Sequence, residues 1–175
     1  MKDNLLFQHN PMVIKIPSPQ KILIIYNPIS SAGNTEAMAC KLETELMFHG
    51  KTVEVRTSEK KMKGYMRISD DIAASDLVVV VGGDGTIRKL LDIINKTATP
   101  IYAIPGGNES LFARFCEMSA SAEDLLQSIT SGTCLQQFYG LISGKGIQGE
   151  KPFFNMASMG LDSLTVKNIG KRKGP

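Results

Sequence analysis

DLVVVVGGDGTIRKLLDII, residues 76–94, carries the clearest structural signal in this chain. Its first part is an apolar run rich in valine, which indicates a strand buried on both faces, as in a parallel sheet covered by helices. Three glycines and one acid, Asp84, follow directly. Apolar residues then recur at the i, i+3, i+4 and i+7 positions of an amphipathic helix. The stretch therefore predicts a strand, a tight turn and a helix, with a carboxylate at the start of the helix.

The same alternation extends in both directions along the chain. Short apolar or alternating runs predict strands at residues 21–27, 51–58 and 100–105, in addition to the one at 76–81. Helical patterns separate and follow these strands, at residues 35–50, 59–75, 87–94, 109–118 and 121–132. Strands that alternate with helices form parallel sheets with helices on both faces. The predicted fold class is therefore α/β.

Changes in character divide the chain into three predicted parts. Residues 1–20 form an irregular leader, in which MVIKI could add one edge strand, and residues 21–132 form the α/β domain. After Gly132, TCLQQFYGLISG and KPFFNMASMG indicate two strands joined by a glycine-rich turn, as in a β-hairpin. We expect residues 133–175 to be the start of a truncated, β-rich second domain.

The composition is that of an ordinary globular protein. Of the 175 residues, 42% are hydrophobic and 21% are charged, and the net charge of +3 is too small to indicate nucleic acid as a partner. No apolar run approaches the ~20 residues that a membrane span needs, and the N-terminus lacks the apolar core of a signal peptide. The three cysteines are too scattered for a disulfide framework or a zinc site. We therefore expect a cytoplasmic protein, with no more than a peripheral contact with a membrane.

Four loops of unusual composition follow the predicted strands. They are YNPISSAGN, RTS, GGDGT and IPGGNES, in chain order. In an open parallel sheet, ligands bind at the carboxyl ends of the strands. We therefore expect these loops to converge on one edge of the sheet and to form a binding site there.

GGDGT has the features of a phosphate-binding turn. Glycine lets the backbone adopt positive φ and lets a ligand approach closely, and the helix that begins near Thr86 presents free N–H groups and the positive end of its dipole. Asp84 alone would repel a phosphate, so it fits best if a divalent cation lies nearby. The alternative is that Asp84 only caps the helix and the glycines only make a tight turn; this motif alone does not separate the two. It is not a Walker A loop, because the Gly-Lys-Ser/Thr ending is absent.

The first loop, YNPISSAGN, offers the side-chain amide of Asn27 at a strand end, with Ser30 behind it. Such a loop can hydrogen-bond to an adenine, a ribose or a phosphate. Taken alone, the stretch is more typical of an ordinary proline turn.

Five segments together resemble the diacylglycerol kinase catalytic domain family, which includes bacterial lipid kinases and sphingosine kinases. They are NPISSAG, Thr57 at the end of a strand, DLVVVVGGDGT, PGGNESLFAR and FFNMASMGLD, in this order. The resemblance extends over roughly residues 20–165. GGDGT also occurs in the related NAD kinases, whereas the last two segments favour the lipid kinases. The resemblance implies a nucleotide-binding domain of the NAD kinase/diacylglycerol kinase type.

The resemblance also implies an ATP-dependent transfer of phosphate to the hydroxyl group of diacylglycerol or a related lipid. Mg²⁺ would bridge the ATP phosphates and offset their charge. Asp84 is the acid of this chain that could act as metal ligand or as catalytic carboxylate. The residues expected to bind the nucleotide are Asn27, Ser30, Thr57, Gly82, Gly83, Gly85, Thr86 and Gly107.

Several positions depart from the family pattern. Arg88 and Lys89 stand where the family often has Asn-Glu, and a solvated helix face would account for them. In PGGNESLFAR, Asn108, Ser110 and Leu111 replace residues that line the cleft in the family, so the choice of substrate is left open. The family's second domain supplies a general base and much of the lipid pocket, and we expect almost all of it to be missing here.

The sequence therefore leaves three functions open. The first is a lipid kinase, truncated or split and inactive alone, that meets its lipid substrate at a membrane surface. The second is an NAD kinase-like enzyme with a soluble substrate, and the third is a non-catalytic nucleotide-binding remnant. An incomplete second domain would expose Phe153 and Phe154, which a homo-oligomer or a missing partner segment would cover.

Overall fold

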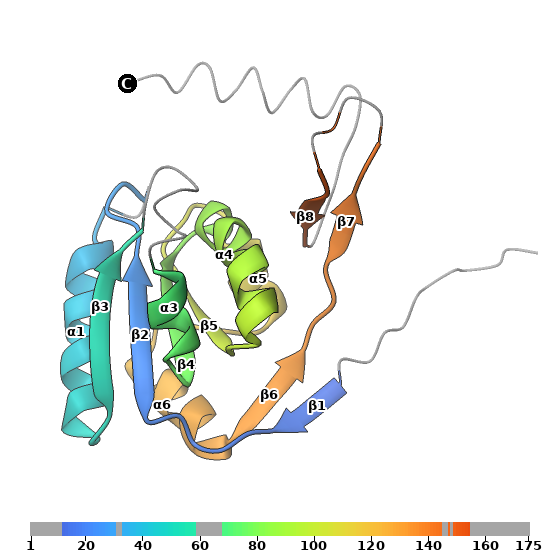
Figure 1. Cartoon of the computed structure of the whole chain (residues 1–175). Helices are drawn as coiled ribbons and strands as arrows, with labels where there is room; N and C mark the ends of the chain where they lie inside the picture. Colours follow the sequence, from blue (N-terminus) through green and yellow to red (C-terminus); the bar gives the residue numbers. More distant parts are fainter. Residues whose placement is uncertain (1–11, 31–32, 59–67, 145–146, 148, 155–175) are drawn as a thin grey trace, which may run out of the picture. The chain divides into compact units, whose positions relative to one another are not determined.

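The computed structural model describes residues 12–30, 33–58, 68–144, 147 and 149–154. The chain divides into two compact units, residues 1–138 and 139–175 (Figure 1). Much of the helix predicted at 59–75 lies outside the described residues, as does the segment that follows Phe154.

A four-stranded parallel sheet forms the centre of the first unit. Its strands are β2 (Lys21–Tyr26), β3 (Thr52–Thr57), β4 (Leu77–Gly82) and β5 (Ile101–Pro105), arranged in the order β3-β2-β4-β5. The predicted α/β fold class is therefore confirmed. The chain passes from β2 to its neighbour β3, then crosses to β4 on the opposite side of β2, and continues outward to β5. The connections that follow β2 and β4 therefore lead toward opposite edges of the sheet. Open parallel sheets bind ligands at such a switch point.

Helices cover both faces of this sheet (Figure 1). On one face, α1 (Thr35–Phe48) and α6 (Ala122–Ser131) pack buried aliphatic side chains against alternate residues of β2 and β4. On the other face, α3 (Ser69–Ala73) contacts α4 (Asp84–Thr97), which in turn contacts β4. All six residues of β4 are buried. Since each fully buried Val or Leu side chain contributes roughly 1.5–3 kcal/mol, this strand is a major part of the core.

The helix ends agree with the sequence signals at α6 and differ at two other helices. The Ser121 hydroxyl accepts a hydrogen bond from the Asp124 N–H at the start of α6, at 3.3 Å, and Gly132 ends it with a φ of 58°. α4 begins at Asp84, before the start near Thr86 that the sequence predicted, and Gly83 is its N-cap residue. α5 (Leu111–Phe115) is shorter than predicted over 109–118, because Ser110 before it has a φ of 46° and Glu117 after it has a φ of 54°. Among the described residues, no helix is long and apolar enough to cross a bilayer.

Two small antiparallel sheets complete the described structure. β1 (Met12–Lys15) pairs with β6 (Thr133–Gln136), and β7 (Gly140–Ile142) pairs with β8 (Lys151–Phe153). The strand predicted in MVIKI is present, and it pairs with β6 outside the four-stranded sheet. The sequence TCLQQFYGLISG, interpreted as one strand, forms two, and the predicted hairpin is made by the second of them with β8. β6 lies in the first unit, so the structural division falls after residue 138, whereas the predicted boundary was at 132.

The starts of β2 and β4 are joined through Asp76. Its carboxylate accepts the backbone N–H groups of Lys21 at 2.8 Å and Gln20 at 2.9 Å, and these bonds lower its pKa below the ordinary value of 3.8. We expect Asp76→Ala to lower the free energy of unfolding by about 1 kcal/mol per lost bond at pH 7, because both N–H groups lose their partner.

The pH dependence of this effect has a definite sign. A carboxylate whose folded-state pKa is lowered stabilises the fold above its unfolded-state pKa and loses this contribution as the pH falls through the folded-state value. The difference between wild type and Asp76→Ala should therefore be constant near neutral pH and shrink below the ordinary pKa of 3.8. Urea unfolding at several pH values measures it, and a difference that grows in acid would contradict the assignment.

Candidate functional site

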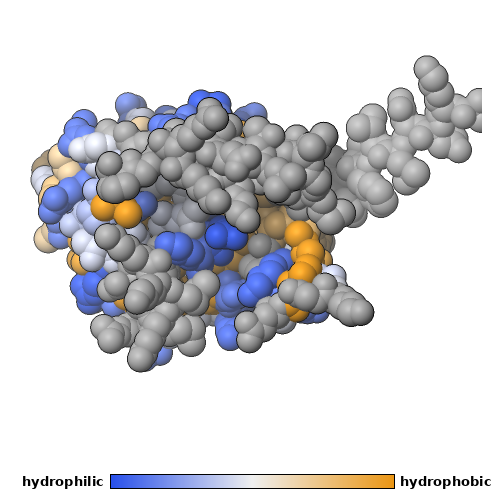
Figure 2. All heavy atoms as spheres, turned by 90° about the horizontal axis from the view of Figure 1, so that it is seen from above, coloured by the Kyte–Doolittle hydropathy of each residue, from blue (hydrophilic) through white to orange (hydrophobic). Residues whose placement is uncertain are grey.

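The four predicted loops do converge on one edge of the sheet. Because all four strands are parallel, their carboxyl ends lie at the same edge, and the loops that follow them start there. We call this edge the rim and define it by residues 27–30, 57–58, 82–86 and 105–110. Figure 2 looks at the molecule from above the view of Figure 1, and hydrophilic side chains gather near the middle of that face.

Two glycine pairs of the rim, first Gly82–Gly83 and second Gly106–Gly107, lie directly against each other. The Gly106 N–H donates to the Gly82 carbonyl at 3.0 Å. A Cβ atom on Gly107 would lie 2.9 Å from the Cα of Gly83, and one on Gly106 would lie 3.1 Å from the backbone nitrogen of Gly82. Real Cβ atoms essentially never come within 2.9 Å of a backbone atom, so the approach of the two loops requires glycine at Gly107, and the approach at Gly106 is tighter than most real Cβ contacts.

Positive φ is one reason for glycine in a phosphate-binding turn, but it does not explain the glycines of GGDGT. Gly82, Gly83 and Gly85 all have ordinary φ angles. A Cβ on Gly82 would lie only 3.1 Å from the Thr86 hydroxyl oxygen, whereas one on Gly83 would make an ordinary contact of 3.4 Å with the Cα of Gly107. Gly85 is different, because it is exposed, lies in the first turn of α4, and a Cβ atom there would meet nothing within 4 Å. No contact with a described residue accounts for the glycine at this position.

Asp84 is held by the backbone of the neighbouring helix α5. Its carboxylate oxygens accept the N–H of Leu111 at 3.0 Å and the N–H of Phe112 at 2.8 Å. These are the first two residues of α5, so Asp84 caps α5, although it belongs to α4. The carboxylate thus joins the loop after β4 to the segment after β5, at the place where the two glycine pairs meet.

The described residues do not form a ready-made metal centre. No group of three His, Cys, Asp or Glu side chains within the described ranges is placed to hold a metal ion. Asp84 is the carboxylate of GGDGT, and its two oxygens have lone pairs beyond those used by the two N–H groups.

The loop after β2 is tied to β4 and to the loop after β5. The Asn27 N–H donates to the Val81 carbonyl at 3.0 Å, and the Asn27 side-chain oxygen accepts the Ile29 N–H at 3.2 Å. The Ser30 hydroxyl donates to the Gly106 carbonyl. Asn27 and Ser30 are thereby brought next to the glycine pairs, as the sequence predicted for a shared site.

Thr57 lies on the other side of β2 from the glycines. It ends β3, is exposed, and stands in register with Tyr26. The Tyr26 hydroxyl donates to the Glu36 carboxylate at 3.2 Å, and burial together with this carboxylate raises the pKa of Tyr26. The phenol therefore stays protonated near neutral pH. Thr57 is on the rim, but the structure does not place it with the residues of GGDGT.

Two buried hydroxyl groups have roles that the sequence did not predict: Thr35, which lies beside the rim, and Ser110, which was noted above only as a departure from the family pattern. Thr35, at the start of α1, is 3% exposed and its hydroxyl donates to the Asn27 carbonyl at 2.7 Å. Ser110 is 4% exposed, has a left-handed φ, and its hydroxyl bonds to the backbone of Gly107. Both are buried hydroxyl residues beside glycine-rich turns, and that proximity is the signal that could have singled them out.

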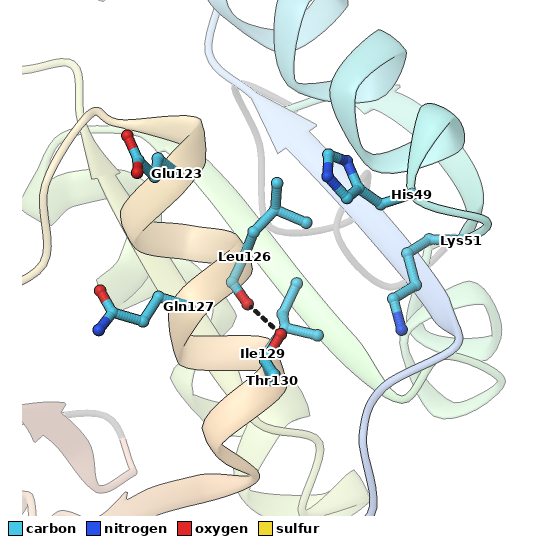
Figure 3. Close-up of a pocket in the computed structure, with 7 residues that line it drawn as sticks. All are labelled: His49, Lys51, Glu123, Leu126, Gln127, Ile129 and Thr130. Atoms are coloured by element: carbon cyan, nitrogen blue, oxygen red, sulfur yellow. Dashed lines mark hydrogen bonds between the residues drawn. The ribbon is translucent and has the colours of Figure 1, made fainter.

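A depression of about 560 Å³ lies elsewhere, between the end of α1 and α6 (Figure 3). Its lining residues are His49, Lys51, Glu123, Leu126, Gln127, Ile129 and Thr130. Lys51 directly precedes β3, so the depression is at the amino-terminal edge of the sheet, opposite the rim. Volume alone does not make it the functional site, because the glycine loops and the helix N-terminus that suit an anionic ligand are at the other edge.

The comparisons with known proteins agree with this geometry. The model of the diacylglycerol kinase catalytic domain matches residues 21–139. A protein of Streptococcus pneumoniae serotype 4 named "Putative lipid kinase" is 25% identical over 139 residues, which are 73% of this chain and 47% of that protein. The crystal structure of a diacylglycerol kinase from Bacillus anthracis strain Sterne is 21% identical, with a TM-score of 0.54 over 63% of this chain and 40% of that one, and supports the fold.

This chain spans about half the length of these relatives. The matched segment contains the whole four-stranded sheet and all four loops of the rim. It begins at the first residue of β2 and ends one residue after the first compact unit. Since the family model matches well over half of the chain, the protein belongs to the diacylglycerol kinase catalytic domain family.

Proposed function

We propose that the chain binds ATP at the rim and transfers its γ-phosphate to the hydroxyl group of a lipid, diacylglycerol or a related one. The acceptor oxygen forms a bond to the γ-phosphorus, and the bond from that phosphorus to the β–γ bridging oxygen breaks. ADP leaves with the electron pair, and the hydroxyl proton passes to a base. Family membership supports a kinase, and the lipid acceptor is the finer part of the proposal.

Gly85 is the observation that carries the proposal. Glycine costs about 0.5–1 kcal/mol relative to alanine in a helix interior, and less in the first turn, where Gly85 lies. This glycine is exposed, and a Cβ there would meet no described atom within 4 Å. A phosphate that approaches the first-turn N–H groups of α4 would fill that space, and it could do so only if this residue has no side chain. The same N–H groups and the positive end of the α4 dipole favour a negative charge there.

The chain's own residues would divide the work at this site. The first turn of α4 would bind phosphate oxygens, and the Asn27 side-chain amide would donate to the nucleotide, since its oxygen already accepts from Ile29. Mg²⁺, when bound with ATP, supplies positive charge that offsets the phosphates. Asp84 is the candidate catalytic carboxylate and metal ligand, while its bonds to α5 fix its position.

The lipid acceptor would be met at a membrane surface, where the protein would bind peripherally. The relatives of this chain are about twice as long, so the rest of a lipid pocket would come from a further segment or a partner chain. The antiparallel β7–β8 pair of the second unit is the described part to which such a segment could add strands.

The proposal is tested by Gly85→Ala, with Glu123→Ala at the equivalent position of α6 as matched control. We expect Gly85→Ala to raise the free energy of unfolding by up to about 1 kcal/mol, because alanine is the better helix former. The same change should weaken ATP binding about tenfold or more, because the Cβ occupies the phosphate position. Titration calorimetry and urea unfolding measure both quantities, and equal ATP binding by the two variants would contradict the proposal.

Phosphoryl transfer is measured with labelled ATP, magnesium and either lipid vesicles or NAD. Label in the lipid fraction supports the lipid kinase. Label in NAD alone would assign an NAD kinase-like activity, and ATP binding without transfer to either would assign a non-catalytic nucleotide-binding protein. If wild type does not bind ATP, the phosphate site at the rim is wrong.

A further inference from the structure

Thr35 closes the loop that carries Asn27. Its hydroxyl donates to the Asn27 carbonyl at 2.7 Å across eight residues of chain, and only 3% of Thr35 is exposed. The Asn34 side chain, which precedes it at the N-cap of α1, makes no capping hydrogen bond. The Thr35 hydroxyl therefore fixes the loop backbone at the residue whose side chain is expected to meet the nucleotide.

The methyl group of Thr35 faces the second glycine pair. Its Cγ2 atom lies 3.0 Å from the position that a Cβ on Gly106 would take, so methyl and glycine are in close contact. The Gly106 carbonyl also accepts the Ser30 hydroxyl, and the Gly106 N–H donates to Gly82. One side chain thus touches the loop after β2 with its hydroxyl and the loop after β5 with its methyl.

We propose that Thr35 is a positioning residue for the nucleotide site, a role that rests on the ATP binding proposed above. It sets the distance between the Asn27 loop and the paired glycine loops, so that a nucleotide can contact both at once. The contact between the loops after β2 and β5 passes across the end of β4, which carries GGDGT. Small displacements of such groups have large effects on binding and on transfer.

The two halves of the side chain can be removed separately. Thr35→Val keeps the methyl group and the approximate volume and replaces the hydroxyl with a second methyl, whereas Thr35→Ser keeps the hydroxyl and loses the methyl. Thr44→Val is the matched control, because Thr44 lies on the same helix, is exposed, and donates its hydroxyl to the Cys40 carbonyl at 2.9 Å away from the rim.

We expect Thr35→Val to raise the Kd for ATP about tenfold, with a larger effect on the KM for ATP than on kcat in the transfer assay. Thr35→Ser should restore binding to within about threefold of wild type, and Thr44→Val should bind as wild type does. Amide hydrogen exchange at Gly106 and Ile29, measured without ligand, should be faster in Thr35→Val and unchanged in Thr44→Val.

The outcomes separate this inference from the proposed function. If wild type binds ATP and Thr35→Val binds it equally well, the positioning role is wrong and the proposed function stands. If wild type does not bind ATP, both fall together. If Thr35→Val does not fold, Thr35→Ser decides: ATP binding and amide exchange near wild-type values support the hydroxyl as the positioning group, and losses as large as those expected for Thr35→Val overturn it.

Discussion

Gly107→Ala is expected to weaken ATP binding by about 100-fold. The loops after β4 and β5 would move apart by up to about 1 Å, and their N–H groups would no longer face the same ligand. The added Cβ would lie 2.9 Å from the Cα of Gly83, which is backbone and cannot rotate away. The two loops must therefore separate. Overpacking of this kind also costs about 1–3 kcal/mol of stability, which denaturant unfolding would measure beside the ATP titration.

Gly144→Ala is the control for this change. A Cβ on Gly144 would meet the Ile147 side chain at 3.9 Å, an ordinary contact. It should leave ATP binding and stability near wild-type values. ATP binding by Gly107→Ala at wild-type strength would show that the contact between the glycine pairs is dispensable for the site.

Asp84→Ala has the second large expected effect, a loss of phosphoryl transfer of at least about 100-fold, the usual range for removing a group that acts on the reacting charges. It also leaves the N–H groups of Leu111 and Phe112 without their carboxylate, so the free energy of unfolding should fall by roughly 1–3 kcal/mol. Transfer of label from ATP and urea unfolding measure the two effects independently.

Asp84→Asn separates the two roles of this carboxylate. An amide oxygen can still accept a backbone N–H, so part of the lost stability should return. The negative charge does not return, so transfer should stay as low as in Asp84→Ala. Recovery of transfer in Asp84→Asn would make Asp84 purely a cap of α5. Asp92→Ala, on the exposed face of the same helix, should change neither quantity.

The strands and helices were predictable where periodicity is strong and local. β4 is buried along its whole length and α4 has a regular apolar face, so 76–94 specifies its own conformation. The parallel order then follows from the alternation, and it places the four loops at one edge without any knowledge of their contacts. Membership of the family was evident from the same loops.

The contacts within the site were not predictable, because they join residues distant in sequence. Asp84 caps a helix that begins 27 residues later, and no local pattern around Asp84 encodes that partner. The short length of α5 follows from the left-handed backbone of Ser110 and of Glu117, and neither residue type is typical of this conformation. Likewise, TCLQQFYGLISG is apolar enough for one long strand, and only its pairing partners divide it into β6 and β7.

The order of the sheet has a consequence for the synthesis of this protein on the ribosome. β2 is the first strand of the sheet to be made, yet it lies between β3 and β4. Its residues from Ile22 to Ile25 are almost fully buried in the finished structure. At about 5–20 residues per second, seconds pass between the emergence of β2 and the completion of β4. Nascent chains that end before Gly82 therefore expose an apolar strand with one open edge, and KILIIY is the segment that a chaperone would have to shield.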